Sequence, residues 1–201
     1  MNITLYEYPG SRSQRVRWML DELGVEFTSY AGREVFEMPA FHAASPHGRV
    51  PAVEIDGEPL IESAAICTYL ADLYPEKGLI PATGTVERAR HDQWVCFVLT
   101  ELEAYLWIIH SNTKRYKGDR QVREIIPQAE HEARRALKLL EAHLSNQDYL
   151  LGDAFQVTDL IAGFAVNWAD GYNLLDKFPA LTAYLDRLYA RPACGLKKAD
   201  G

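Results

Sequence analysis

Apolar positions at the start of the chain switch from a period of two to a helical period. Residues 3–8 alternate and are rich in aromatic and β-branched side chains, which predicts a strand. Apolar residues at 16, 20 and 23 follow at helical spacing. Ser11 and Gln14 have the spacing of a capping box, so we expect a helix that begins at Ser11 and ends at Gly24.

The next fifty residues complete a small α/β pattern. The expected elements are strands over 27–30, 52–55 and 60–61, a weaker helix over 36–43 and a helix over 63–73. Asp56-Gly57 is a hairpin signal between the last two strands. The order β-α-β-α-β-β-α is the thioredoxin-like arrangement, in which Pro51 occupies the cis-proline position. We therefore assign residues 1–78 to a thioredoxin-like domain.

The remainder of the chain has a helical pattern. Residues 79–84 read as a linker, and helices are expected over 86–109, 122–144, 158–172 and 179–190. No convincing strand signal occurs after residue 80. Residues 85–201 are therefore expected to form an all-α domain, a helical bundle.

Composition excludes several function classes. The 201 residues are 48 % apolar and 24 % charged, which is ordinary for a soluble globular protein. The net charge of −7 disfavours nucleic acid as a partner, and no apolar run approaches the ~20 residues that span a membrane. Cys67, Cys96 and Cys194 have no metal-binding or disulfide spacing, so we expect no metal and a cytoplasmic location.

Three segments together resemble the cytosolic glutathione S-transferases. They are Leu5–Gly24 with Ser-Arg-Ser at 11–13, Ser45–Val53 before the expected cis-proline, and Leu60–Leu70 with its Glu-Ser pair. The resemblance covers nearly the whole chain and is closest to bacterial members with the Ser-Arg-Ser segment. It implies conjugation of the glutathione thiolate to small apolar electrophiles, with glutathione as co-substrate and no metal. It also implies a homodimer that pairs the α/β half of one chain with the helical half of the other.

The resemblance places a glutathione site in the first domain. Glu62 and Ser63 stand at a helix start, where backbone N–H groups, the hydroxyl and the helix dipole favour a carboxylate, here that of the γ-glutamyl unit. A cis peptide at Val50-Pro51 would offer the Val50 backbone to the cysteinyl unit as an added strand. Arg49 stands where many members bind the glycyl carboxylate, and it is one of 6 basic residues, against 12 acidic ones, in residues 1–80.

The group that activates the thiol has several candidates. Ser11 lies where serine-type members place their hydroxyl, although it is also a candidate helix cap. Tyr6 matches the catalytic phenol of tyrosine-type members, and Arg12 matches an arginine that favours the thiolate. Ser13 is a further hydroxyl that would contact glutathione. Each would stabilise a thiolate whose free thiol has a pKa of roughly 8.5.

Cysteine chemistry is not expected at this site. Cysteine-type members need a thiol at the start of the first helix, and Arg12 occupies that place here. Cys67 lies inside the third predicted helix, and we expect it to be a core residue. Mixed-disulfide exchange with glutathione is therefore not expected.

The second substrate would bind between the two halves, because pockets favour domain interfaces. The helical residues that could line this site are Tyr105, Ile109, Trp168 and Tyr172. Core packing explains the same residues, so both interpretations stay open. Two other functions also remain: a glutathione-dependent isomerase or peroxidase on the same site, and a non-catalytic partner-binding relative.

The helix predicted over 158–172 departs from the family at its start. Asp159 matches a structural aspartate of the family. Most members place Ser or Thr three residues before it as the N-cap, whereas Gln156 stands there in this chain. Gln is a poor cap, so Thr158 is the alternative, with a later helix start.

Overall fold

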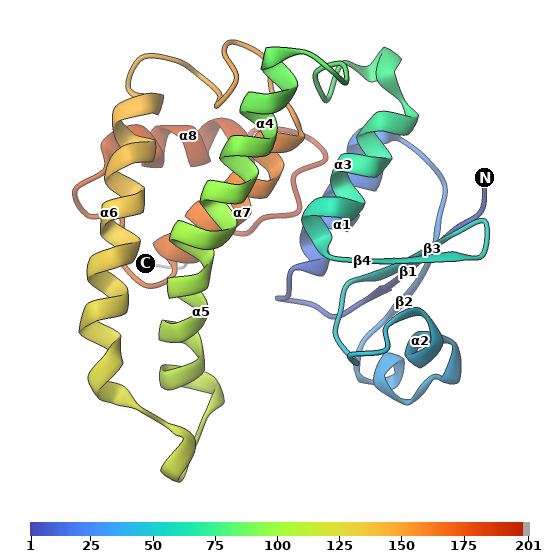
Figure 1. The fold of residues 1–201 in the computed structure, drawn as a ribbon, viewed down its shortest axis with the longest axis horizontal. Helices are drawn as coiled ribbons and strands as arrows, with labels where there is room; N and C mark the ends of the chain where they lie inside the picture. The colour runs from blue at the N-terminus through green and yellow to red at the C-terminus, as the bar shows by residue number, and fades with distance from the viewer. Residues whose placement is uncertain (199–201) are drawn as a thin grey trace. The chain divides into compact units, whose positions relative to one another are not determined.

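The structure is a computed structural model and describes residues 1–198 (Figure 1). By its contacts the chain divides into two compact units. The first unit contains Met1–Ala82 and Pro192–Leu196, and the second contains Thr83–Arg191 with Lys197 and Lys198.

A four-stranded mixed sheet forms the centre of the first unit. Its strands are β1 (Ile3–Glu7), β2 (Thr28–Ala31), β3 (Ala52–Ile55) and β4 (Glu58–Ile61). Their spatial order is β2-β1-β3-β4, with β1 parallel to β2 and both β1–β3 and β3–β4 antiparallel. This topology confirms the predicted thioredoxin-like arrangement.

Helices cover both faces of the sheet (Figure 1). They are α1 (Ser13–Leu23), α2 (Pro39–Ala44) and α3 (Ser63–Leu73), and short 3₁₀ turns occupy Arg33–Glu37 and Pro75–Lys77. Helices α1 and α3 pack on each other on one face, and α2 contacts β3 and β4 from the other. The core under α2 contains Tyr6, Val35, Phe41, Ala44 and Ala52.

The strand register brings three distant segments to one end of this sheet. Tyr6 pairs with Ala52 and Ala52 pairs with Ile61. The residues that follow β1, precede β3 and follow β4 therefore lie at the same end of the strands. These are the three segments in which the resemblance places the glutathione site.

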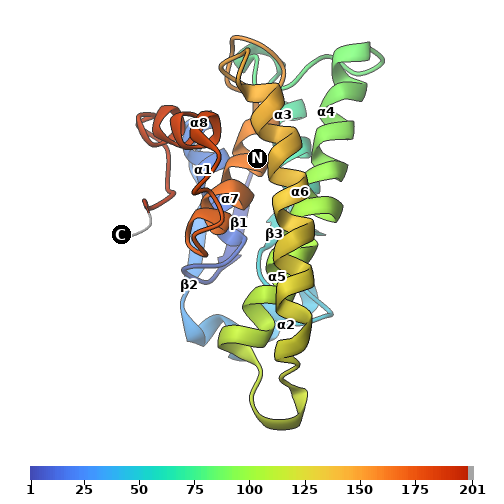
Figure 2. The same ribbon diagram turned by 90° about the vertical axis from the view of Figure 1, so that its left-hand side faces the viewer.

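The second unit is helical. Its helices are α4 (Val86–Phe97), α5 (Ala104–His110), α6 (Ile126–Leu144), α7 (Val157–Asp170) and α8 (Pro179–Tyr189). The views in Figures 1 and 2 agree that α6 lies alongside α5, and α8 packs on both α6 and α7. Within residues 83–198 the structure has no strand, only an isolated bridge between Tyr149 and Gly152.

Several predicted helix boundaries are wrong for local reasons. The helix predicted over 122–144 begins at Ile126, because a 3₁₀ turn occupies Arg123–Ile125 and Pro127 stands in the first turn of the helix, and the helix predicted to end at residue 172 ends at Asp170. Helix α1 begins at Ser13 with Arg12 as its cap residue, not at Ser11, because the Ser11 hydroxyl bonds within the preceding turn. The helix predicted over 86–109 is interrupted by a π-helical stretch over Val98–Glu103, and a second π-helical turn, Ser111–Arg115, follows α5.

The start of α7 settles the choice between the two predicted caps. Gln156 is the N-cap, and its backbone N–H donates to the Asp159 carboxylate over 2.9 Å. The Thr158 hydroxyl does not cap the helix and instead lies 2.8 Å from Nδ1 of buried His91. The helix therefore starts at Val157, one residue before the predicted start.

Two structural features are absent from residues 1–198. No helix in this range combines the length and the apolar character needed to cross a bilayer. Nor does this range hold three or more His, Cys, Asp or Glu side chains grouped to bind a metal ion.

Candidate active site

The turn between β1 and α1 is held together by two serine hydroxyls. The Ser11 oxygen lies 2.7 Å from the Tyr8 carbonyl and 2.8 Å from Oγ of Ser13, and it accepts the Ser13 N–H over 3.1 Å. Ser11 is half-buried, whereas Ser13 is buried and accepts the Tyr8 N–H over 3.3 Å. Ser11 therefore presents the more accessible hydroxyl, and Ser13 supports its position.

The Tyr6 side chain lies on the face of the sheet that α2 covers. Its ring is 2 % exposed and packs against Tyr30 and Phe41 under α2. Its hydroxyl donates to Oε2 of Glu54 over 2.6 Å. Burial raises the pKa of Tyr6 well above its ordinary value, and the hydrogen bond to Glu54 raises it further. These contacts occupy the proton that a thiolate-stabilising phenol would need.

Ser45 closes the loop that leads into β3. Its buried hydroxyl donates to the Arg49 carbonyl over 2.7 Å and accepts the Arg49 N–H over 3.1 Å. The Val50-Pro51 peptide that follows is cis, which confirms the prediction for this bond. The Arg49 side chain is exposed and has no acidic partner within 4 Å among residues 1–198. Its guanidinium is therefore available to a ligand carboxylate.

The start of α3 has an unusual backbone. Glu62 precedes the helix with φ 69° and ψ 104°, a left-handed conformation that non-glycine residues adopt at a cost of about 1–3 kcal/mol. Ser63, the first residue of α3, is 5 % exposed. Nη1 of buried Arg15 on α1 donates to its hydroxyl over 3.4 Å. A buried cation therefore supports the helix N-terminus at the position where a carboxylate is expected.

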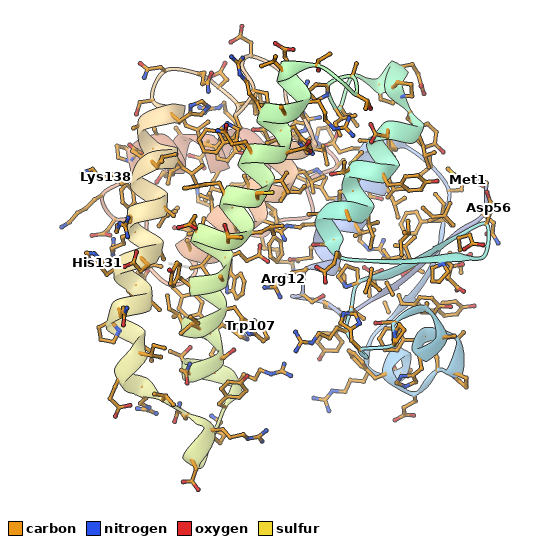
Figure 3. All side chains as sticks on the ribbon, in the orientation of Figure 1. Met1, Arg12, Asp56, Trp107, His131 and Lys138 are labelled. Carbon is orange, nitrogen blue, oxygen red and sulfur yellow. The ribbon has the colours of Figure 1, made fainter. Side chains whose placement is uncertain are left out.

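Sequence reasoning did not find a role for Arg15. The sequence did contain a signal for a buried arginine. Arg15 lies four residues before Met19 and three before Trp18, on the apolar face of α1. A buried charge on an apolar helix face needs a polar partner. Arg12, by contrast, is half-buried at the beginning of α1 (Figure 3).

In the helical unit, two of the four predicted second-substrate residues lie close together. The Tyr172 hydroxyl is 3.0 Å from Nδ1 of His110, and the His110 ring meets Trp168 edge-on at 5.7 Å. Ile109 is 1 % exposed, as a core residue is, and Tyr105 has no ring contact among residues 1–198. His110 and its neighbour Trp107 were not predicted.

Two domain-sized matches fit this architecture, in which a thioredoxin-like unit carries a polar site and a helical unit follows. Residues 5–78 match the family model of the glutathione S-transferase N-terminal domain, and residues 92–192 match that of the C-terminal domain. The fold and the site define a thioredoxin-like enzyme with an added helical domain. The chain belongs to the glutathione S-transferase family, whose enzymes take glutathione as substrate.

Individual relatives agree with this assignment. Protein LigF of Sphingobium is 30 % identical, with 96 % of this chain and 91 % of LigF covered. The maleylacetoacetate isomerase of Pseudomonas aeruginosa is 29 % identical over 92 % of this chain and 90 % of its own. A glutathione transferase from Methylococcus capsulatus superposes with a TM-score of 0.84 at 31 % identity, covering 96 % and 95 % of the two chains. A sphingomonad glutathione S-transferase in complex with glutathione gives 0.82 at 28 % identity, with the same coverage.

Proposed function

We propose that this protein binds glutathione in its first unit and transfers the glutathione thiolate to a small electrophile. The observation that carries the proposal is the sheet register, which brings Ser11, the Val50-Pro51 peptide and Ser63 to one end of the sheet. Family membership supports glutathione as the ligand. No step requires a metal, since the thiolate is itself the nucleophile.

Each part of glutathione has a candidate partner at this sheet end. The γ-glutamyl carboxylate binds the N-terminus of α3 through the Ser63 hydroxyl and backbone N–H groups, after the strained Glu62. The cysteinyl unit pairs with the Val50 backbone next to Pro51. The glycyl carboxylate binds Arg49. Arg15, behind Ser63, is a positioning residue that adds positive charge below the first carboxylate.

Ser11 is the proposed thiolate donor, with Arg12 as the nearby cation and Ser13 as a supporting hydroxyl. The Ser11 oxygen already accepts the Ser13 N–H, which strengthens its own O–H as a donor. Rotation of the hydroxyl away from the Tyr8 carbonyl would direct its proton to the sulfur. The donor, the start of α1 and a guanidinium all favour the charged form of the thiol.

A titration of the pure protein with glutathione tests the proposal. Thiolate absorbance in the ultraviolet is followed across pH at saturating protein. A bound thiol with a pKa below the ordinary ~8.5 supports an activating site. Binding with an unshifted thiol would leave a non-catalytic, partner-binding relative of the fold as the better explanation.

Ser63→Ala is expected to weaken glutathione binding between about tenfold and a hundredfold. The reason is the loss of a hydrogen bond to a charged group, which contributes about 1.5–3 kcal/mol. Calorimetric titration with glutathione measures the effect. Ser145→Ala, which removes an exposed hydroxyl at the end of α6, is the matched control and should bind as wild type. Unchanged binding by Ser63→Ala would remove the carboxylate site from α3.

Tyr6→Phe is expected to leave the thiol pKa and the conjugation rate within about twofold of wild type. Its hydroxyl is committed to Glu54, so the substitution should cost only stability, about 1 kcal/mol. Urea unfolding and a steady-state conjugation assay measure the two effects. A large loss of bound thiolate in this variant would return the catalytic role to Tyr6.

Isomerisation is the second candidate reaction, since one relative is a maleylacetoacetate isomerase. Both reactions begin with the bound thiolate, and they differ in its fate. Conjugation consumes glutathione in proportion to product, whereas isomerisation returns it. Measuring free glutathione during turnover with a given substrate separates them.

We also propose that the protein acts as a homodimer, on the strength of its family alone. Size-exclusion chromatography with light scattering measures the molar mass of the protein and tests this directly. A mass of one chain at micromolar concentration would contradict it.

A further inference from the structure

A set of aromatic and cationic side chains gathers on α5, the π-helical turn after it and the end of α7. We call it the α5–α7 cluster, and its members are Trp107, His110, Lys114, Arg115, Trp168 and Tyr172. The ring centroids of Trp107 and His110 lie 5.8 Å apart and nearly parallel. The four ring-bearing residues are all half-buried, so each keeps some exposed surface.

Two cations lie over the rings of this cluster. Nζ of Lys114 is 5.3 Å from the Tyr172 ring centroid, and the Arg115 guanidinium is 5.5 Å from that of Trp107. Both side chains are exposed, and neither has a carboxylate within 4 Å among residues 1–198. The cations are therefore held by neutral ring faces, which leave their charge uncompensated.

The surrounding segment is basic in an acidic protein. Residues 111–125 contain 5 Lys or Arg and 2 Asp or Glu, a net charge of +3, although the whole chain carries −7. The rest of the chain therefore carries −10. This local excess gives the α5–α7 cluster a positive potential that attracts anions.

The π-helical turn aligns the second cation with the rings. In an uninterrupted α-helix, Arg115 would lie eight residues after Trp107, roughly 80° away around the axis. A π turn holds about one more residue than an α turn. The Tyr116 N–H bonds the Ser111 carbonyl over 2.7 Å, as this wider turn requires. The extra residue returns Arg115 to the face of Trp107.

We propose that the α5–α7 cluster binds the second substrate, and that this substrate is a flat aromatic ring that carries a carboxylate. This proposal depends on the proposed transferase function only in that the ligand is called a substrate. Binding of the aromatic acid at the cluster does not depend on it. The ligand ring stacks on Trp107, and Trp168, which meets the His110 ring edge-on, is steeply inclined to Trp107 and can contact the ligand ring edge-on. Its carboxylate pairs with Lys114 and Arg115, and the hydrogen-bonded His110–Tyr172 pair supplies a polar edge.

Direct binding tests the assignment without any turnover. The probes are 3-nitrobenzoate and its neutral isostere 3-nitrobenzamide, titrated into the full chain while tryptophan fluorescence is followed. The other two tryptophans, Trp18 and Trp94, are 0 % and 7 % exposed, so quenching reports on the cluster. We expect the acid to bind about tenfold more tightly than the amide, about 1.4 kcal/mol. Added salt should reduce that preference.

Substitutions assign the preference to the two cations. The double variant Lys114→Gln/Arg115→Gln should lose the tenfold preference and still bind the amide. Lys138→Gln is the matched control, because Lys138 is an exposed cation that points into solvent from α6 (Figure 3). It should keep the preference. Equal affinity for the two probes in wild type, or the same loss in Lys138→Gln, would overturn the assignment.

A conjugation assay separates this assignment from the proposed function. The reactive pair is 4-chloro-3-nitrobenzoate and 4-chloro-3-nitrobenzamide, on which the glutathione sulfur replaces chloride. If both react equally and the double variant changes neither, conjugation stands and the aromatic-acid assignment fails. If neither reacts but the acid still binds tenfold more tightly than the amide, the assignment stands and the transferase proposal fails.

Discussion

Asp159→Ala is expected to lower the free energy of unfolding of the protein by about 4 kcal/mol. Asp159 is fully buried, and its carboxylate accepts three hydrogen bonds: 2.8 Å from the Leu150 N–H, 2.9 Å from the Gln156 N–H and 3.1 Å from the Tyr184 hydroxyl. Alanine leaves the Leu150 and Gln156 N–H groups without this acceptor, at about 1–3 kcal/mol each when neither relaxes. The Tyr184 hydroxyl keeps the Asp159 backbone carbonyl, 3.2 Å away, as an acceptor. Since domains are stable by only 5–15 kcal/mol, the loss is large.

Urea unfolding at neutral pH measures this effect through the transition midpoint. Asp170→Ala is the matched control, since it removes the same side chain from the last residue of the same helix. An acidic group there is unfavourable to the helix dipole, so its removal should be neutral or slightly stabilising. Equal losses in the two variants would show that Asp159 has no special role.

The charge of Asp159 adds a pH dependence with a definite sign. Burial raises the pKa of Asp159 from 3.8 to about 6, against hydrogen bonds from Leu150, Gln156 and Tyr184 that lower it. The folded protein therefore binds a proton that the unfolded chain has released between about pH 4 and pH 6. The contribution of this group to stability falls as pH rises through that window, by up to about 3 kcal/mol.

Asp159→Asn isolates this term, because the amide does not titrate. The stability advantage of wild type over this variant should be largest below about pH 4 and shrink by pH 6. Urea midpoints of both proteins across pH measure it. An advantage that grows with rising pH would mean that the folded state prefers the anion.

The sequence predicts the elements best where burial and local signals agree. The helix over 63–73 was predicted to the residue, because its apolar positions keep helical spacing and Pro75 follows. The start of α1 failed because serine hydroxyls also bond locally. The Ser11 hydroxyl lies within hydrogen-bond distance of the Tyr8 carbonyl and the Ser13 N–H. It therefore stabilises the turn before α1 and does not cap the helix.

Some features of the candidate site were predictable from the sequence and others were not. The resemblance to the glutathione S-transferases predicts that Val50, Pro51 and Ser63 belong to one site, and the strand register brings their segments to one end of the sheet. The environment of Tyr6 could not, because it depends on Glu54, 48 residues away. The His110–Tyr172 contact joins residues 62 apart. The π turn that aligns Arg115 has no sequence signature of its own.

Ser11→Ala is expected to lower kcat/KM for conjugation by about a hundredfold, because one preorganised donor to a developing or resident anion contributes on that scale. The same change should return the pKa of bound glutathione toward about 8.5 and leave the affinity for the protonated thiol nearly unchanged. The assay is conjugation to 1-chloro-2,4-dinitrobenzene, together with the thiolate titration across pH. Ser11→Thr keeps the hydroxyl and should retain most of the activity.

Two comparisons separate donation from mere support of the turn. Ser13→Ala removes the buried hydroxyl that lies 2.8 Å from Ser11 Oγ. If Ser11 donates to sulfur, Ser11→Ala shifts the pH profile by more than a unit and Ser13→Ala by much less. If the serines only hold the turn, both variants lose stability together and the thiol pKa stays where wild type has it. Should Ser11→Ala keep its thiolate, Arg12→Gln becomes the decisive variant, because the Arg12 guanidinium is then the remaining side chain that we propose to favour the anion.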